Sequence, residues 1–449
     1  MPKITIIGAG LAGTLLALYL ARRGYELDIY ESRTDLRLQE DEGGRSINLA
    51  LSCRGLTSLN AVGLQHLVQK LIVPMRGRAI HDVSGQLTLQ PFGRHHEEYI
   101  NAIERSELNK LLLNEVEKYP NIRFYFSTRL RGIDFERKTL FLETKERGLY
   151  EQTYERIIGA DGAGSCVRDV LNAKKLIRAH RNFLSYGYKE LSIGEAGQNH
   201  LLAEHLHLWP RNSFLLLGNP NRDRSITGSL FLPLTGNDSF DCLQNEAQIN
   251  HFFSLHFADA VDKMPNLIQE FCQRPTGNMS TIQCDSWHYQ DQCMLIADAA
   301  HGVVPFFGQG MNSAFEDCRI LNELLDTHHD SWDKVMPAFY QQRKPNTDAV
   351  AQMSMDNFYE IQSNIQERRF NLKKQLEHCL MERYPEYYLS KHVMVMFTNI
   401  PYVEAQIYGE IQAEFLELLC EDVESITEID WQKVEKHLNY YGKKMTDIA

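Results

Sequence analysis

The apolar positions at the start of the chain predict a strand, a helix and a second strand. Lys3–Ile7 is a short apolar run rich in β-branched residues, which is typical of a buried strand. Residues 14–23 have helical spacing and stop before Gly24, and Glu26–Tyr30 is apolar again. A helical crossover implies that the two strands run parallel. We therefore predict a βαβ unit at the N-terminus.

The middle of the chain has a different pattern. Short runs rich in β-forming residues occur at 183–193, 205–209, 214–217 and 226–232, and Asn219-Pro220-Asn221 marks a turn between the last two. These runs predict a mainly antiparallel sheet inserted into the first domain.

The last third of the chain favours helices. Residues 294–297 predict one more buried strand, and residues 312–325 have the apolar spacing of a helix. Beyond Pro345 the sequence is rich in Glu, Gln, Met and Tyr, and nearly all of it is predicted to be helical.

Composition excludes several classes of protein. The 449 residues are 43% hydrophobic and 24% charged, which is ordinary for a globular protein of two or three domains. A net charge of −12 without a basic block disfavours nucleic-acid and anionic-membrane partners. No apolar run is long enough to span a membrane, and a glycine-rich turn interrupts the N-terminus before a signal peptide could form. Nine cysteines without a Cys-x-x-Cys pair predict no metal site and a reduced, cytoplasmic location.

A dinucleotide fingerprint follows the first strand. Gly8, Gly10 and Gly13 have the G-x-G-x-x-G spacing, and Glu31 ends the next strand. The glycines allow a tight turn, the approach of a pyrophosphate and close helix–strand packing, while the acidic residue can accept hydrogen bonds from ribose hydroxyls. The alternative is a glycine-rich turn that binds nothing, and the fingerprint alone does not separate FAD from NAD.

Two later segments favour FAD. Ile157-Ile158-Gly159-Ala160-Asp161-Gly162 places an Asp-Gly after a strand, and it resembles a motif of flavoprotein aromatic hydroxylases. Asp298, after another strand, can hold ribityl hydroxyls, although it can also be a simple helix cap. The glycine-rich turn at 308–312 begins a helix whose free N–H groups would stabilise negative charge on a reduced flavin.

A more specific resemblance extends from residue 3 to about residue 410. In collinear order these segments are similar to kynurenine 3-monooxygenases, a family of single-component FAD-dependent aromatic hydroxylases. The segments are Gly44-Arg45-Ser46-Ile47-Asn48-Leu49-Ala50-Leu51-Ser52, Glu104-Arg105-Ser106-Glu107-Leu108-Asn109-Lys110, Tyr188-Lys189-Glu190-Leu191, Trp209-Pro210-Arg211-Asn212 and Val304-Pro305-Phe306-Phe307-Gly308-Gln309-Gly310-Met311-Asn312.

The resemblance implies a fold and a set of cofactor residues. The fold is an α/β, Rossmann-like FAD-binding domain with an inserted antiparallel sheet domain for the substrate and a helical C-terminal region. The expected division is 1–75, 100–180 and 285–345 for FAD, 76–99 and 181–284 for the sheet, and 346–449 for the helices. The FAD contacts that the resemblance implies are Ala12, Tyr30, Glu31, Ser32, Arg33, Ala50, Arg105, Leu130, Cys166, Asp298, Gly310, Met311 and Asn312.

The resemblance also implies a substrate clamp. Arg78, Tyr99, Asn357 and Tyr402 fall where the family binds the amino-acid end of kynurenine, and Phe231 and Phe306 are candidates to pack its ring. Arg78 by itself is also compatible with a solvated surface arginine. No catalytic side chain is expected, because the flavin carries the chemistry, and we interpret His301 as a buried structural histidine.

The implied reaction is hydroxylation of L-kynurenine to 3-hydroxy-L-kynurenine with NADPH and O₂, through a flavin C4a-hydroperoxide, in tryptophan catabolism and NAD biosynthesis. Alternatives are hydroxylation of another aromatic compound and a non-enzymatic flavoprotein. A halogenase is disfavoured because no Trp-x-Trp-x-Ile-Pro segment is present. We expect a monomer or homodimer.

Two departures from the family pattern stand out. Ala297 precedes Asp298 where these hydroxylases usually have glycine, and residues 410–449 are acidic and amphipathic where the eukaryotic enzymes carry an apolar anchoring tail. The second departure favours a bacterial-type form without a membrane anchor.

Overall fold

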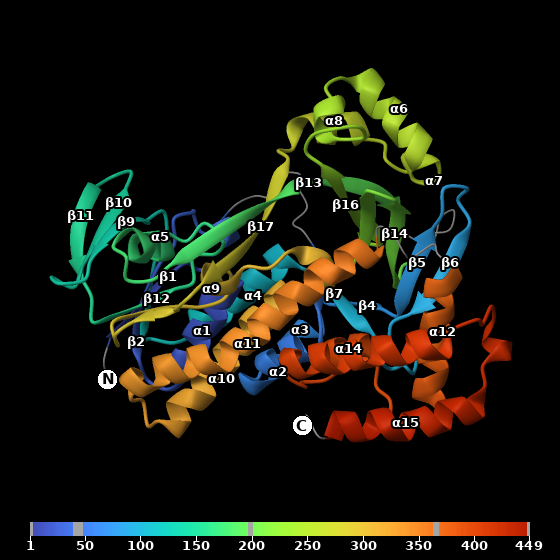
Figure 1. The fold of residues 1–449 in the computed structure, drawn as a ribbon. Helices are drawn as coiled ribbons and strands as arrows, with labels where there is room; N and C mark the ends of the chain where they lie inside the picture. Colours follow the sequence, from blue (N-terminus) through green and yellow to red (C-terminus); the bar gives the residue numbers. More distant parts are fainter. Residues whose placement is uncertain (1–2, 39–47, 196–200, 362–367, 447–449) are drawn as a thin grey trace. The chain divides into compact units, whose positions relative to one another are not determined.

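A computed structural model of the chain describes residues 3–38, 48–195, 201–361 and 368–446 (Figure 1). The chain forms two compact units. Unit 1 comprises residues 1–72, 103–184 and 279–351, and unit 2 comprises residues 73–102, 185–278 and 352–449. Gly44–Ile47, the start of one segment of the family resemblance, lies outside the described residues.

Unit 1 is organised around a six-stranded sheet with the order β18-β19-β12-β1-β2-β8. The strands β19, β12, β1, β2 and β8 pair in parallel, and β18 pairs antiparallel with β19. Their bounds are β1 Lys3–Ile7, β2 Glu26–Tyr30, β8 Ile122–Tyr125, β12 Arg156–Gly159, β18 His288–Tyr289 and β19 Cys293–Leu295. Ile4 and Ile6 in the central strand β1 are fully buried, as expected for a parallel sheet covered on both faces.

Helices of unit 1 pack on this sheet and on one another, and α1 lies beside α4 and α10. The first helix begins at Leu11, earlier than predicted, because Gly10 with extended backbone serves as its N-cap. A small antiparallel sheet, β11-β10-β9, completes the unit. The remaining elements are β3 Asn48–Leu51, β9 Arg129–Asp134, β10 Thr139–Thr144, β11 Gly148–Thr153, α1 Leu11–Arg22, α2 Cys53–Ala61, α3 Gln65–Val68, α4 Arg105–Val116, α5 Cys166–Ala173, α9 Asp298–His301 and α10 Gly310–Thr327, with 3₁₀ turns η1 Leu36–Leu38 and η3 Pro305–Phe307.

Unit 2 contains most of a seven-stranded sheet with the order β17-β13-β16-β15-β14-β5-β6. In this order β13, β16, β15 and β14 pair antiparallel with their neighbours, and β14 pairs in parallel with β5. The long strand β13 and strand β17 begin in one unit and end in the other. The seven strands are β5 Gly77–His81, β6 Leu87–Pro91, β13 Ala179–Glu195, β14 His205–Arg211, β15 Phe214–Pro220, β16 Ser225–Pro233 and β17 Gly277–Cys284. This is the inserted, mainly antiparallel sheet that the middle of the sequence predicts. Strands β4 Val73–Met75 and β7 Ile100–Glu104 pair antiparallel with each other in a separate sheet.

Two groups of helices belong to unit 2. The first follows β16 and packs Phe253 and Phe257 against the sheet core. The second forms its own core, in which Leu376, Leu380 and Val434 are fully buried. The helices are α6 Glu246–His256, α7 Ala258–Val261, α8 Leu267–Gln273, α12 Arg368–Arg383, α13 Lys391–Phe397, α14 Tyr402–Leu419 and α15 Trp431–Thr446, with 3₁₀ turns η2 Phe240–Cys242 and η5 Ile426–Glu428.

One long helix, α11 Trp332–Tyr359, runs through Pro337 and Pro345 without ending at either. The expected start of the helical region at residue 346 therefore falls inside a helix. The α/β architecture predicted from the sequence, with an inserted antiparallel sheet and a helical C-terminal region, is confirmed. Within the described residues, none of the helices is both long and apolar enough to cross a membrane.

Candidate functional site

The fingerprint turn between β1 and α1 shows why each glycine is needed. Gly8 has φ +105°, and a Cβ there would lie 2.5 Å from the carbonyl oxygen of Ala160. A Cβ on Gly13 would lie 2.0 Å from the carbonyl oxygen of Gly8. A Cβ on Gly10, in contrast, would meet no atom within 4 Å. Packing therefore requires Gly8 and Gly13, whereas open space lies above Gly10, where the fingerprint expects a pyrophosphate.

Glu31 is the acidic residue at the end of β2, and its carboxylate is well supported. Oε2 accepts a hydrogen bond from the Ala9 N–H at 2.9 Å, and Oε1 accepts from the Arg33 N–H at 2.8 Å and from Arg33 Nε at 2.9 Å. Burial by itself would raise the pKa of Glu31, but the hydrogen bonds from Arg33 and Ala9 lower it overall. The carboxylate is thus ionised and able to accept ribose hydroxyls, and the exposed Arg33 side chain can move aside for them.

A pocket that opens to solvent lies beside this carboxylate, and its empty space is about 360 Å³ when the solvent at its mouth is included. Its lining is Ala9, Glu31, Arg33, Thr34, Leu36, Asn109, Leu113 and Phe126. Asn109 Nδ2 donates to the Ala9 carbonyl at 3.3 Å and so ties α4 to the fingerprint turn. Apolar walls with a carboxylate at the rim suit an adenosine group.

The second segment positions Asp161 under the start of α5. Oδ2 of Asp161 accepts from the Cys166 N–H at 2.7 Å, while its Oδ1 is buried without a hydrogen-bond partner. Burial raises the pKa of Asp161 and also raises that of the Cys166 thiol, to about 11. The thiol is therefore neutral and not a nucleophile, and the unpartnered Oδ1 is an atom that a bound ligand could satisfy.

The third segment presents Asp298 and the start of α10. Asp298 is exposed and is the first residue of α9, whose N-cap is Ala297. Asn312 is fully buried, where its Nδ2 donates to the carbonyls of Ala50 and Gly308 at 2.8 Å and its Oδ1 accepts from the Ser52 N–H at 2.9 Å. The amide of Asn312 thus fastens β3 to the turn before α10, beside the half-buried Met311.

The other candidate FAD residues also lie in unit 1. Tyr30 is buried and stacks on Tyr125 with ring centroids 4.7 Å apart, and Leu130 is buried in β9. Ala12, Ser32, Ala50 and Arg105 are partly or fully exposed near these turns. The unpartnered Oδ1 of Asp161, the open space above Gly10 and the exposed carboxylate of Asp298 together fit FAD.

In unit 2, Arg78 on β5 is the most unusual of the substrate candidates. Its Nη1 donates to Gln90 Oε1 at 3.2 Å, and its guanidinium lies 5.5 Å from the Phe92 ring centroid. Burial lowers the pKa of Arg78, an effect that Glu360 partly offsets. Among the described residues, no carboxylate lies within ion-pair distance of Arg78. A partly buried guanidinium with only a neutral partner can receive an anion.

The other substrate candidates are spread over several elements. Tyr402 is fully buried at the start of α14, Asn357 is half-buried on α11, and Phe231 is buried in β16 near Tyr188. Tyr99 is 37% exposed and lies under the Arg76 guanidinium, 5.4 Å from ring centroid to Cζ. Phe306 belongs to unit 1, in η3.

Three charged or titratable side chains around Arg78 were missed by sequence reasoning. Glu360 influences both Arg78 and Lys374, and Lys374 Nζ lies 3.5 Å from Glu360 Oε1. His392 stacks on Phe92 at 5.7 Å, and its burial, reinforced by Arg78 and Lys374, lowers its pKa well below the usual value. Glu360 follows Asn357 by three residues, a helical spacing that could have drawn attention to it. Lys374 and His392 carry no comparable signal.

Comparisons with known proteins first define the class. Residues 2–208 match the family described as FAD binding domain. The tetrameric form of 2-methyl-3-hydroxypyridine-5-carboxylic acid oxygenase has a TM-score of 0.67 at 19% identity, over 83% of this chain and 96% of that chain. The tetracycline destructase Tet(51) has a TM-score of 0.62 at 17% identity, over 86% and 98%. The chain therefore has the FAD-binding aromatic hydroxylase fold.

Closer relatives identify the family within this class. The kynurenine 3-monooxygenase of Legionella pneumophila (strain Corby) is 58% identical over 448 residues, which is 100% of both chains. The kynurenine 3-monooxygenase of Myxococcus xanthus is 38% identical over 96% of this chain and 93% of its own length. The chain belongs to the kynurenine 3-monooxygenase family, as the sequence motifs predict.

Proposed function

We propose that this chain hydroxylates L-kynurenine to 3-hydroxy-L-kynurenine, using FAD, NADPH and O₂. When bound, FAD supplies the redox chemistry that transfers one oxygen atom of O₂ to the aromatic ring. The chain's own residues bind and orient the substrate and exclude water from it. The aniline nitrogen already activates the adjacent ring carbon, so no side-chain base is assigned.

Residues of unit 1 would hold the cofactor. Glu31 would accept the ribose hydroxyls, the turn at Gly10 would admit the pyrophosphate, and Asp298 would bind the ribityl chain. The N-terminal N–H groups of α10, at Gly310 and Met311, would face the flavin and favour negative charge on it.

Residues of unit 2 would bind the amino-acid end of the substrate, and Arg78 is the observation that carries this proposal. A carboxylate of the substrate would provide the anion that Arg78 lacks within the described residues. Tyr99, Asn357 and Tyr402 would add neutral hydrogen-bonding groups, while Phe231 would contact the ring.

We further propose a cytoplasmic enzyme that is a monomer or homodimer. All nine cysteines are free thiols, which suits a reducing compartment. No residue is assigned to the choice between NADPH and NADH.

The first experiment measures NADPH oxidation by the flavin-loaded protein with and without L-kynurenine, with mass spectrometry of the product. We expect strong stimulation and a product heavier by one oxygen atom. Stimulation that yields peroxide but no hydroxylated product would make kynurenine an effector only. No response from the loaded protein would overturn the proposed substrate.

The second experiment tests Arg78. In Arg78→Ala we expect the KM for L-kynurenine to rise about 10- to 100-fold at normal FAD content, because a charge-assisted bidentate contact contributes about 1.5–3 kcal/mol. Arg369→Ala is the matched control, since Arg369 is an exposed arginine of unit 2 that pairs with Glu417. An unchanged KM in Arg78→Ala would remove Arg78 from the clamp.

The substrate analogue without the carboxylate completes this test. The wild-type protein should handle the analogue about as poorly as Arg78→Ala handles L-kynurenine, and Arg78→Ala should lose nothing further with the analogue. Additive losses would mean that Arg78 acts on another part of the substrate.

A further inference from the structure

Ala297, the residue before Asp298, has a backbone conformation that suits glycine. Its φ is +54° and its ψ is −142°, a region that residues with a Cβ rarely occupy. The residue is buried, between the end of β19 at Leu295 and the start of α9. This conformation explains why the strand predicted over residues 294–297 ends early. Contacts with neighbouring residues must therefore stabilise a backbone conformation that alanine disfavours.

The carboxylate of Asp317, on α10, supplies that hold. Its Oδ2 accepts the Ala297 N–H at 2.9 Å and lies 2.6 Å from His301 Nε2, which donates to it. Burial alone would raise the pKa of Asp317, but His301 and Arg343 lower it, so the carboxylate is ionised. One fully buried carboxylate thus accepts hydrogen bonds from both the first and the last residue of the turn that contains Asp298.

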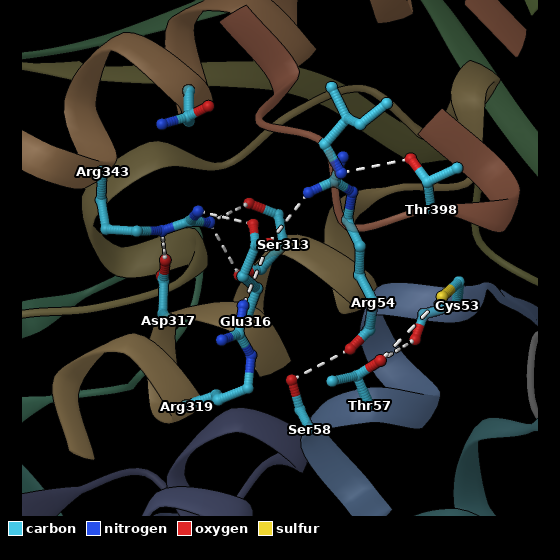
Figure 2. A network of polar contacts seen from close by, with 12 residues as sticks. Cys53, Arg54, Thr57, Ser58, Ser313, Glu316, Asp317, Arg319, Arg343 and Thr398 are labelled. Carbon is cyan, nitrogen blue, oxygen red and sulfur yellow. Dashed lines mark hydrogen bonds and ion pairs between the residues drawn. The ribbon is translucent and has the colours of Figure 1, made fainter. Parts of the chain in front are cut away.

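A larger ionic cluster fixes Asp317 itself (Figure 2). Arg343 Nε donates to Asp317 Oδ1 at 2.7 Å, and Arg343 Nη1 donates to Glu316 Oε2 at 2.5 Å. Arg54 Nη1 donates to Glu316 Oε1 at 2.9 Å. The His301 ring packs on Trp287 with centroids 4.9 Å apart. The position of the Asp317 carboxylate is therefore determined by α2, α10 and α11 together.

We propose that His301 and Asp317 are positioning residues for FAD, because they hold Ala297 in a glycine-like conformation that aims the Asp298 carboxylate at the cofactor. The inference rests on the assignment of Asp298 to FAD in the proposed function. It gives His301 a role beyond packing and explains how alanine is tolerated at position 297.

The test is a double-mutant cycle between positions 301 and 297, read as the Kd of the apoprotein for FAD by flavin fluorescence. His301→Leu should raise the Kd about 10-fold or more, because His301 shares Oδ2 of Asp317 with the Ala297 N–H, and without it this oxygen is no longer fixed at Ala297, which can then relax and carry Asp298 away. Ala297→Gly alone should change the Kd less than about 3-fold. In the double variant, glycine adopts the required conformation unaided, so the Kd should return to within about 3-fold of the wild-type value.

The visible spectrum of the bound flavin is a second readout, because it reports cofactor placement apart from turnover. We expect it to be altered in His301→Leu and restored in the double variant. His301→Gln keeps a donor for Asp317 and should remain near wild type. If His301→Leu does not fold, His301→Ala replaces it in the same cycle.

Several outcomes would overturn the proposal. A folded His301→Leu apoprotein with wild-type FAD affinity would do so, and so would a loss that glycine at position 297 does not recover, since a merely structural histidine gives no such rescue. Asp298→Ala tests the assignment of Asp298 to FAD separately from the positioning role of His301. If Asp298→Ala binds FAD normally, the assignment of Asp298 fails, whatever the substrate proves to be.

Discussion

The two units of this protein satisfy their buried cations in different ways. In unit 1, Arg54 and Arg343 are at most 3% exposed, and both pair with carboxylates. In unit 2, Lys189 Nζ donates to the carbonyls of Phe271 and Arg274, at 2.8 and 2.7 Å. Arg211 likewise donates to backbone carbonyls, including that of His256 at 2.6 Å. Neither Lys189 nor Arg211 has a carboxylate within ion-pair distance in the described part of the chain.

This difference has a physical consequence for each unit. The carboxylates of unit 1 neutralise its buried arginines, so the cluster is a charge-balanced frame around the turns that we assign to FAD. The buried cations of unit 2 are bound by neutral groups, and burial lowers the pKa values of Lys189, Arg211 and Arg78, an effect that Asp259 and Asp82 partly offset for Arg211 and Glu360 for Arg78. Arg78 has a charge without an ion-pair partner among the described residues, which favours an anionic ligand. The frame suits a fixed cofactor, and Arg78 suits a substrate that carries a carboxylate.

Arg343→Met should give the largest effect, because it leaves two buried carboxylates short of a partner. We expect a loss of about 3–5 kcal/mol in the free energy of unfolding, the usual result of breaking a buried ion pair from one side. The urea midpoint followed by circular dichroism measures it. Glu151→Gln, which breaks an exposed pair with Arg137, is the control and should change stability by less than about 1 kcal/mol. Equal effects in the two variants would contradict a charge-balanced frame.

His207 should make the stability of unit 2 depend on mildly acidic pH. Its Nδ1 lies 2.8 Å from His81 Nε2, and His81 in turn contacts Asp259. Burial, together with the neighbouring His81 and His205, lowers the pKa of His207 to about 4, although the Leu202 backbone and Asp259 oppose the shift.

The sign follows from comparing the two states. The unfolded chain takes up the proton near pH 6.5 and the folded chain near pH 4, so stability falls as pH drops through that window. The full effect is about 3 kcal/mol. In His207→Gln, the urea midpoint should change less between pH 6.5 and 4.5 than it does in the wild type. Parallel pH profiles for the two proteins would show that His207 titrates normally.

Lys189→Met should have a smaller effect than Arg343→Met, because it removes a donor and leaves no charge unpaired. We expect a loss of about 1–3 kcal/mol from the two carbonyls left without Nζ. The same urea titration measures it. A loss as large as that of Arg343→Met would mean that the lysine charge itself is needed, which would remove the contrast between the units.

The sequence predicted unit 1 well because its signals are local. The strand, glycine turn and helix of the fingerprint lie within residues 3–23, and Glu31 follows at once. The parallel order of β1, β2 and β12 follows from such segments together with general rules of chain connection. The strands over the middle of the chain were also predicted, since their β-rich runs are short and separated by turns.

The polar interiors could not be predicted in the same way. Arg54 and Glu316 are far apart in the sequence, and nothing in the spacing of either residue indicates a buried pair. The conformation of Ala297 depends on Asp317, which follows it by twenty residues on another element. Lys374 and His392 reach the surroundings of Arg78 only through tertiary packing. The roles of Tyr99, Asn357 and Tyr402 remain predictions from the family resemblance.

Gly10→Ala should have the smallest effect on stability. It should nevertheless weaken FAD binding, which a matched substitution in unit 2 should not do. A Cβ at Gly10 meets no protein atom within 4 Å and the backbone there is extended, so the apoprotein should unfold within about 1 kcal/mol of wild type. The same methyl group enters the space assigned to the pyrophosphate, so the Kd for FAD should rise at least about 10-fold. Gly442→Ala in α15 of unit 2, another position with open space, is the matched control and should leave FAD affinity unchanged. Normal FAD affinity in Gly10→Ala would mean that the cofactor does not approach this turn, and the frame of unit 1 would need another explanation.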